Sequence, residues 1–151
     1  MDDKYFMKEA LKEAEIAFAK DEVPIGAVIV KDDEIIARAH NLKELRQNPL
    51  AHAELLAIEK ASNKLGTWRL QNCSIFVTLE PCPMCAGAIV QARMKRVIFA
   101  ASDLKSGACG SLYNLAQDER LNHSLEVKSG ILANKSSKLL KDFFQKLRDR
   151  N

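Results

Sequence analysis

The sequence lacks the features that mark a secreted, membrane-spanning or strongly charged protein. It contains no apolar run near the ~18 residues that cross a bilayer. Its opening stretch, MDDKYFMKEA, has mixed charge instead of the basic and apolar regions of a signal peptide. The net charge is only +3, which neither requires nor excludes a nucleic-acid partner. We therefore expect a cytoplasmic protein with no membrane partner.

Cysteine is also scarce, with four residues in a chain of 151. In an intracellular domain of this size, so few cysteines suggest a metal site or catalysis more than a disulfide framework. Cys82 and Cys85 form a Cys-x-x-Cys pair, whereas Cys73 and Cys109 lie far apart in the sequence. The chain therefore offers no second pair for a structural four-cysteine zinc site.

Internal repeats and linker-like segments are absent as well, and the length fits one domain over residues 1–151. Strand and helix patterns alternate after residue 50, which predicts an α/β domain of three layers with a mixed sheet. The apolar periodicities predict helices at 2–20, 51–66, 81–92 and 135–150, and strands at 25–30, 35–39, 74–79, 96–101 and within 124–132. Residues 40–50 are polar, contain Pro49, and are expected to form a loop.

The Cys-x-x-Cys pair does not identify its own chemistry. A strand followed by this pair at the start of a helix is also the arrangement of a thioredoxin-like redox site. Taken alone, Cys82 and Cys85 are therefore compatible with redox exchange, with zinc binding, or with neither.

The segment NPLAHAELLAIEKA adds a third zinc-competent residue, His52, and a carboxylate, Glu54. His52 and Glu54 are expected at the start of one helix and the two cysteines at the start of another, so two helix N-termini can converge on one ion. Three protein ligands leave one corner of a tetrahedral zinc open, as in catalytic sites. Glu54 is then free to carry protons between an attacking water and a leaving group. The alternative is that His52 is an ordinary helix-start residue and Glu54 a solvated acid.

His-x-Glu followed by Pro-Cys-x-x-Cys resembles the signature of the zinc nucleobase deaminases. Within that superfamily, nearly the whole chain resembles the bacterial tRNA-specific adenosine deaminases. The resemblance runs through VPIGAVIV, NPLAHAE, TLEPCPMCAGAIVQARMKRVIFAASDLKSGACGS and the closing DFF helix. It implies a cytidine-deaminase-like fold with about five strands, forming a single zinc-dependent deaminase domain. It also implies conversion of adenosine to inosine at the wobble position of an arginine tRNA.

The resemblance assigns roles to individual positions. It implies one zinc per chain, bound by His52, Cys82 and Cys85, with Glu54 as the proton shuttle. Asn41 should hydrogen-bond the flipped-out nucleoside in a pocket lined by Val28, Ala53 and Leu79. The tRNA anticodon stem-loop should be contacted by Asp103, Lys105, Ser106, Phe143 or Phe144, Arg148 and Arg150. Asn48 and Leu50 depart from the family's usual residues before the zinc histidine, which affects the loop that carries Asn41.

Several of these positions also have a simpler interpretation. Asn41 could be a turn residue, Val28 and Leu79 could be core residues, and Glu80 could be only a helix-start acid. Phe143 and Phe144 are adjacent, so they cannot both face the core from one helix. We expect one to be buried and the other to be exposed beside Lys and Arg, where single-stranded RNA could stack on it.

The resemblance also implies a homodimer. The segment AGAIVQARM is apolar on more than one side, so we expect part of Ala86, Ile89, Val90 and Met94 to be left for a two-fold interface. Three other functions remain open at this point. They are a guanine or cytosine deaminase acting on free bases, a non-catalytic zinc-stabilised RNA-binding module, and a thiol redox protein.

Overall fold

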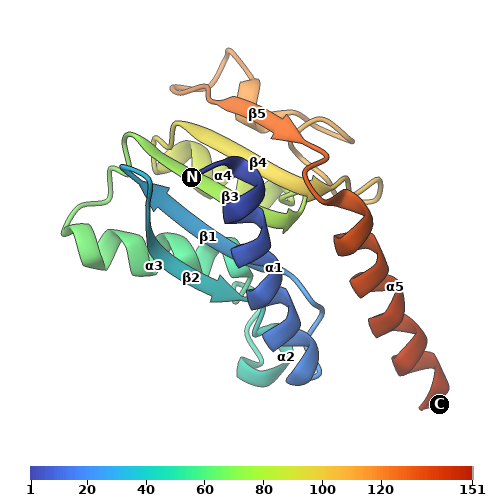
Figure 1. Ribbon diagram of the computed structural model, residues 1–151. Helices are drawn as coiled ribbons and strands as arrows, with labels where there is room; N and C mark the ends of the chain where they lie inside the picture. Colours follow the sequence, from blue (N-terminus) through green and yellow to red (C-terminus); the bar gives the residue numbers. More distant parts are fainter. Residues whose placement is uncertain (151) are drawn as a thin grey trace.

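The computed structural model describes residues 1–150, which form one mixed sheet between two layers of helices (Figure 1). The strands are β1 (Gly26–Lys31), β2 (Glu34–His40), β3 (Cys73–Leu79), β4 (Arg96–Ala101) and β5 (Glu126–Ser129). They lie in the order β2-β1-β3-β4-β5, with β1 antiparallel to both neighbours and β3, β4 and β5 parallel. The predicted three-layer α/β/α fold with five strands is confirmed.

The helices divide between the two faces of this sheet (Figure 1). They are α1 (Asp3–Ala19), α2 (Lys43–Arg46), α3 (Ala53–Leu65), α4 (Pro83–Gln91), the short 3-10 helix η1 (Leu115–Gln117) and α5 (Ala133–Asp149). Helices α1 and α5 pack on one face, and α3 and α4 cover the other. Within residues 1–150, no helix combines the length and the apolar character needed to span a membrane.

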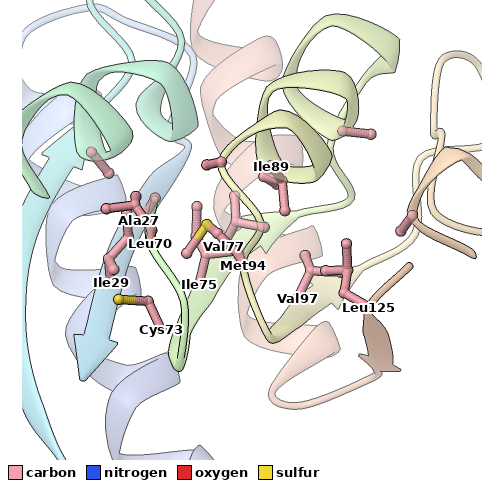
Figure 2. Packing of buried hydrophobic residues seen from close by; sticks show 14 of the residues in the cluster. Ala27, Ile29, Leu70, Cys73, Ile75, Val77, Ile89, Met94, Val97 and Leu125 are labelled. Carbon is pink, nitrogen blue, oxygen red and sulfur yellow. The ribbon is translucent and has the colours of Figure 1, made fainter. Parts of the chain in front are cut away.

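Successive side chains of each strand point to opposite faces of the sheet, so each face has its own hydrophobic core. Ile75 and Val77 of β3 point toward α3 and α4, in the larger cluster drawn in Figure 2. Phe76, between them, points the other way and stacks at 5.3 Å on Phe6 of α1. The thiol of Cys73 lies inside the larger cluster, away from the Cys-x-x-Cys pair.

Local sequence signals fix most element boundaries. Asp32 and Asp33 adopt φ of 51° and 62° between β1 and β2, the left-handed pair that a two-residue hairpin turn requires. Helix α1 is capped by Asp2, whose side chain accepts a hydrogen bond from the Tyr5 amide. Gly66 ends α3 at φ 69°. These boundaries lie within a few residues of the predicted ones.

One α-helix was not predicted. Residues 43–46 form the single turn α2 within the segment expected to be a loop. The buried carboxylate of Glu22 accepts hydrogen bonds from the amides of Glu44 (3.0 Å) and Leu45 (2.6 Å), at the start of this turn. This contact joins residues far apart in the sequence, so the local pattern could not indicate it.

The prediction of which α4 residues form an apolar interface was wrong. Ala86, Ile89, Val90 and Met94 are all buried within the chain's own core. Helix α4 packs against α3 and η1, and its buried side chains share one core with residues of the sheet. These neighbours cover more of its surface than the helical pattern alone suggested. These four side chains therefore leave no apolar surface for a partner.

Candidate metal centre and active site

The site is built at the N-termini of two neighbouring helices. His52 is the N-cap of α3, Cys82 is the N-cap of α4, and Cys85 lies in the first turn of α4. Neither N-cap side chain is used to cap its own helix. The free amide groups and the positive dipole ends of both helices favour thiolates and other anions at this point.

The three side chains are close enough to share one metal ion. Zinc bonds of about 2.3 Å to sulfur and 2.0–2.1 Å to nitrogen place the ligand atoms of a tetrahedral site roughly 3.5–3.8 Å apart. The Nδ1 atom of His52 lies 3.7 Å from Sγ of Cys82 and 3.4 Å from Sγ of Cys85. All three ligand atoms lie within 4.8 Å of one another. The residues therefore fit a zinc ion with three protein ligands.

The protonation of these groups also suits a metal. A hydrogen bond from the Cys85 thiol and a second one with His52 lower the pKa of Cys82 to about 4. The same contact, together with burial, raises the pKa of Cys85, and the hydrogen bond with Cys82 raises that of His52. A metal bound here would replace these hydrogen bonds and displace the protons that the Cys85 thiol and Nδ1 of His52 contribute to them.

Glu54 lies beside the three ligands without being one of them. It belongs to the first turn of α3 and is only 4% exposed. Burial raises the pKa of this carboxyl to about 7. A carboxyl with a pKa near neutrality can both accept and donate a proton at neutral pH.

Two small pockets adjoin Glu54. The first, of about 140 Å³, is lined by Val23, Ile25, Asn41, Lys43, His52, Ala53 and Glu54. The second, of about 110 Å³, is lined by Ile25, His52, Glu54, Leu79, Glu80, Cys82, Asp103 and Ser106. Both are smaller than the ~300–1,000 Å³ of typical ligand sites, so they suit a flat ring more than a whole nucleoside.

The structure brings three of the four predicted pocket residues to this site. Ala53 and Asn41 line the first pocket and Leu79 the second. The Asn41 amide donates to the Val23 carbonyl at 3.2 Å, and its oxygen accepts from the Lys43 amide at 3.0 Å. Asn41 therefore orders the pocket rim as well as lining it.

Val28 is the predicted pocket residue that the structure does not bring there. It packs in the core on the α1 face of the sheet. Val23 and Ile25, which precede β1, line the pocket instead. The one sequence signal for them is their position on either side of Pro24, at the start of the predicted strand 25–30.

A groove leads from α5 to these pockets. Its outer part, about 540 Å³, is lined by Lys105, Leu140, Lys141, Phe144, Leu147 and Arg148. Its inner part, about 500 Å³, is lined by Val23, Leu79, Ser102, Asp103, Leu104, Lys105, Ser106, Leu140 and Phe144. Leu79, Asp103 and Ser106 line both the inner groove and the pocket beside Glu54, so the groove and the pocket adjoin each other.

The predicted RNA-contact residues divide between the groove and the protein body. Phe144 is 43% exposed in the groove, whereas Phe143 is 2% exposed and stacks on Phe18. The predicted division of the two aromatics is confirmed. Arg150 instead forms an ion pair with Asp21, which joins α5 to the end of α1.

Comparison with known proteins places the chain in a family. The model of the MafB19-like deaminase family matches residues 1–148. A tRNA-specific adenosine deaminase from Bacillus subtilis is 56% identical over 146 residues, which is 97% of this chain and 91% of that protein. The chain belongs to the tRNA-specific adenosine deaminases.

Solved structures support this membership. A structure from a study of A-to-I editing by tRNA:A34 deaminases at the wobble position superimposes with a TM-score of 0.87 and 42% identity. The aligned region covers 90% of this chain and 99% of the chain in that structure. A guanine deaminase from Bacillus subtilis is 45% identical, with a TM-score of 0.66, and covers 68% of this chain and 66% of that one. The deaminase fold and the resemblance seen in the sequence are therefore confirmed.

Proposed function

We propose that this tRNA-specific adenosine deaminase converts adenosine to inosine at the wobble position of an arginine tRNA. The observation that carries the proposal is the buried carboxyl of Glu54 beside three zinc-competent side chains, in a pocket that adjoins a groove lined by lysine, arginine and phenylalanine. The chain acts as a single deaminase domain, and we place it in the cytoplasm, where its tRNA substrate is found.

His52, Cys82 and Cys85 would hold one zinc ion per chain. The fit of the donor set and of the distances given above supports this assignment. Bound zinc would act as a Lewis acid and lower the pKa of a water at its open position.

Glu54 would move the protons of the reaction. Hydrolytic deamination adds water to carbon 6 of adenine and releases ammonia, so both protons of the water are transferred. The first goes to the ring nitrogen, and the second goes to the departing amine as the oxygen on carbon 6 becomes a carbonyl. Glu54 can accept the first proton and deliver it to the ring nitrogen, then accept the second from the hydroxyl on carbon 6 and deliver it to the departing amine. A pKa of about 7 matches this double role, because neither protonation state is strongly disfavoured at neutral pH.

The pocket walls would hold the flipped base. Ala53 and Leu79 offer apolar contacts to its faces, and Asn41 offers an amide at the rim. Flipping a base out of a duplex costs a few kcal/mol, so a loop nucleotide such as the wobble adenosine is the favoured substrate.

The groove would take the RNA strand. Asp103, Lys105 and Ser106 lie where the backbone of the anticodon loop would approach the pocket, and Phe144 and Arg148 lie further out along α5. Phe143 and Arg150 would act indirectly, since one packs on Phe18 and the other pairs with Asp21 to hold α5 in place.

The experiment that tests this proposal compares substrates. An anticodon stem-loop with adenine at the wobble position should be deaminated efficiently by the purified protein. Free adenosine should react poorly, because remote RNA contacts supply the binding energy that positions the base. Efficient turnover of guanine or cytosine with no reaction of the stem-loop would contradict the tRNA substrate and favour a free-base deaminase.

Phe144 should bind RNA without stabilising the fold. Stacking of one base on an aromatic side chain contributes about 1–3 kcal/mol, so Phe144→Ala should weaken stem-loop binding about tenfold or more and leave the melting temperature nearly unchanged. Phe143→Ala should instead cost about 3–5 kcal/mol of stability, because it removes a buried ring. Tyr5→Ala, an exposed aromatic outside the groove, is the matched control and should bind normally. Unchanged RNA affinity in Phe144→Ala would remove the stacking role.

We also propose that the protein is a homodimer. The apolar face first expected to carry the interface is buried, so we assign the interface to the side of α4 that is left partly exposed, at Met84, Gly87 and Ala88. Sedimentation at low micromolar concentration should give twice the mass of one chain, and Gly87→Arg should shift the protein toward monomer. A wild-type protein that sediments as a monomer would exclude this assembly.

A further inference from the structure

One buried acidic side chain near the site has no part in the reaction described above. Glu80 lies between the end of β3 and Pro81, two residues before the metal ligand Cys82. It is 3% exposed and forms no ion pair with any residue that the structure describes. A buried carboxylate without a cationic partner needs hydrogen-bond donors to offset its loss of hydration.

Those donors all come from a single segment after β4, residues 103–111. Oε1 of Glu80 accepts from the Asp103 amide at 3.0 Å and from the Ser111 hydroxyl. Oε2 accepts from the amides of Cys109 and Ser111, both at 3.0 Å. One carboxylate thus binds both ends of the segment. The Ala108 amide adds a backbone hydrogen bond to the Pro81 carbonyl at 2.8 Å.

The middle of the segment is shaped to fit this carboxylate. A Cβ atom added to Gly107 would lie 2.3–2.4 Å from the carboxylate carbon and oxygens of Glu80, which no real contact permits. The backbone therefore passes directly over the carboxylate, and a side chain at this position would force the carboxylate and the segment apart.

The segment held in this way carries residues of the site. Asp103 and Ser106 line the pocket together with His52, Glu54 and Cys82, and Lys105 lines the groove. The Asp103 carboxylate in turn accepts from the Lys105 amide at 3.0 Å and from the Ser106 hydroxyl at 2.8 Å. The metal ligands and the wall of the groove are thus connected through Glu80.

We infer that Glu80 is a positioning residue, which fixes residues 103–111 as the wall of the active site so that the RNA strand is aligned with the metal ligands. The inference rests on the proposed function for its RNA part. A carboxylate is required because all of its partners in the segment donate. A glutamine would direct its own amide hydrogens at the donors on one side of this position and leave at least one backbone amide, of Asp103 or of Cys109 and Ser111, unpaired.

The test measures amide hydrogen exchange, metal content and kinetics in Glu80→Gln. Losing hydrogen bonds to a charged acceptor should speed exchange at the Asp103, Cys109 and Ser111 amides by about tenfold or more. The variant should keep about one zinc per chain, because the three ligands are untouched. The KM for the stem-loop should rise about tenfold with kcat within about threefold, as for a lost contribution to binding.

Two further variants make the test specific. Gly107→Ala keeps Glu80 but pushes the segment away, so it should reproduce the faster exchange and the higher KM even if Glu80→Gln folds poorly. Glu22→Gln removes another buried carboxylate that accepts backbone amides, but in a different loop, and should leave exchange at Cys109 and Ser111 unchanged.

Protected amides in both Glu80→Gln and Gly107→Ala, or an unchanged KM with faster exchange, would overturn the inference. A loss of zinc with no change in exchange would do the same, because it would give Glu80 a role at the metal instead. Exchange needs no substrate, so it decides whether Glu80 holds the segment independently of activity. A wild-type protein that leaves the stem-loop unreacted would overturn the proposed function separately.

Discussion

Glu54→Ala should lower turnover of the anticodon stem-loop by about 10²–10⁴-fold, the range that positioned proton transfer contributes. The variant should keep its zinc, because Glu54 is not among the three ligand side chains. It should also keep its affinity for the stem-loop, because the groove residues lie on other elements.

Glu54→Gln sharpens this experiment. It preserves the size of the side chain inside the first turn of α3 and removes only the ability to exchange a proton near neutral pH. Both variants should therefore bind RNA and metal normally and fail in kcat. Near-normal turnover by either one would contradict the assignment of Glu54 as the proton carrier.

Cys82→Ser and Cys85→Ser should each lose the metal, all detectable activity and a large part of the protein's stability. The two cysteines and His52 join the N-termini of α3 and α4, so a bound ion contributes directly to folding. We expect a loss of at least about 3 kcal/mol, which for a domain of this size lowers the melting temperature by about 10 °C. Metal analysis and thermal unfolding measure both effects.

Cys73→Ala provides the matched control for the two ligand variants. Its thiol is buried in the core below α3 and α4 and does not belong to the ligand cluster. The variant should lose about 1–2 kcal/mol of stability through packing and keep its full metal content. Full metal content in Cys82→Ser and Cys85→Ser as well would remove the ligand assignment.

The sequence predicted the parts of the molecule that depend on local patterns. Helical and alternating periodicities located every long element, and the spacing of His52, Glu54, Cys82 and Cys85 predicted the cluster at two helix N-termini. The sequence also predicted that one of Phe143 and Phe144 is buried and the other exposed, because neighbouring residues of a helix point in different directions.

What the sequence could not predict depends on contacts between distant residues. Glu22 stabilises the unpredicted turn α2, and Glu80 binds residues 103–111, although as single acids both resemble ordinary surface residues. Val28 was assigned to the pocket, but the alternation along β1 turns it toward α1. The prediction of an exposed apolar surface on α4 was wrong for the same reason, since a helical pattern does not reveal how many neighbouring elements will cover the helix.

This site is proposed to edit one adenosine in tRNA, and inosine mapping in bulk tRNA can show whether it does. Total tRNA lacking inosine would be incubated with the purified, zinc-loaded protein, and every inosine would then be located by sequencing. We expect inosine at the wobble position of an arginine tRNA, with none formed by Glu54→Gln under the same conditions. No inosine at all, or inosine only at positions outside the anticodon loop, would contradict it.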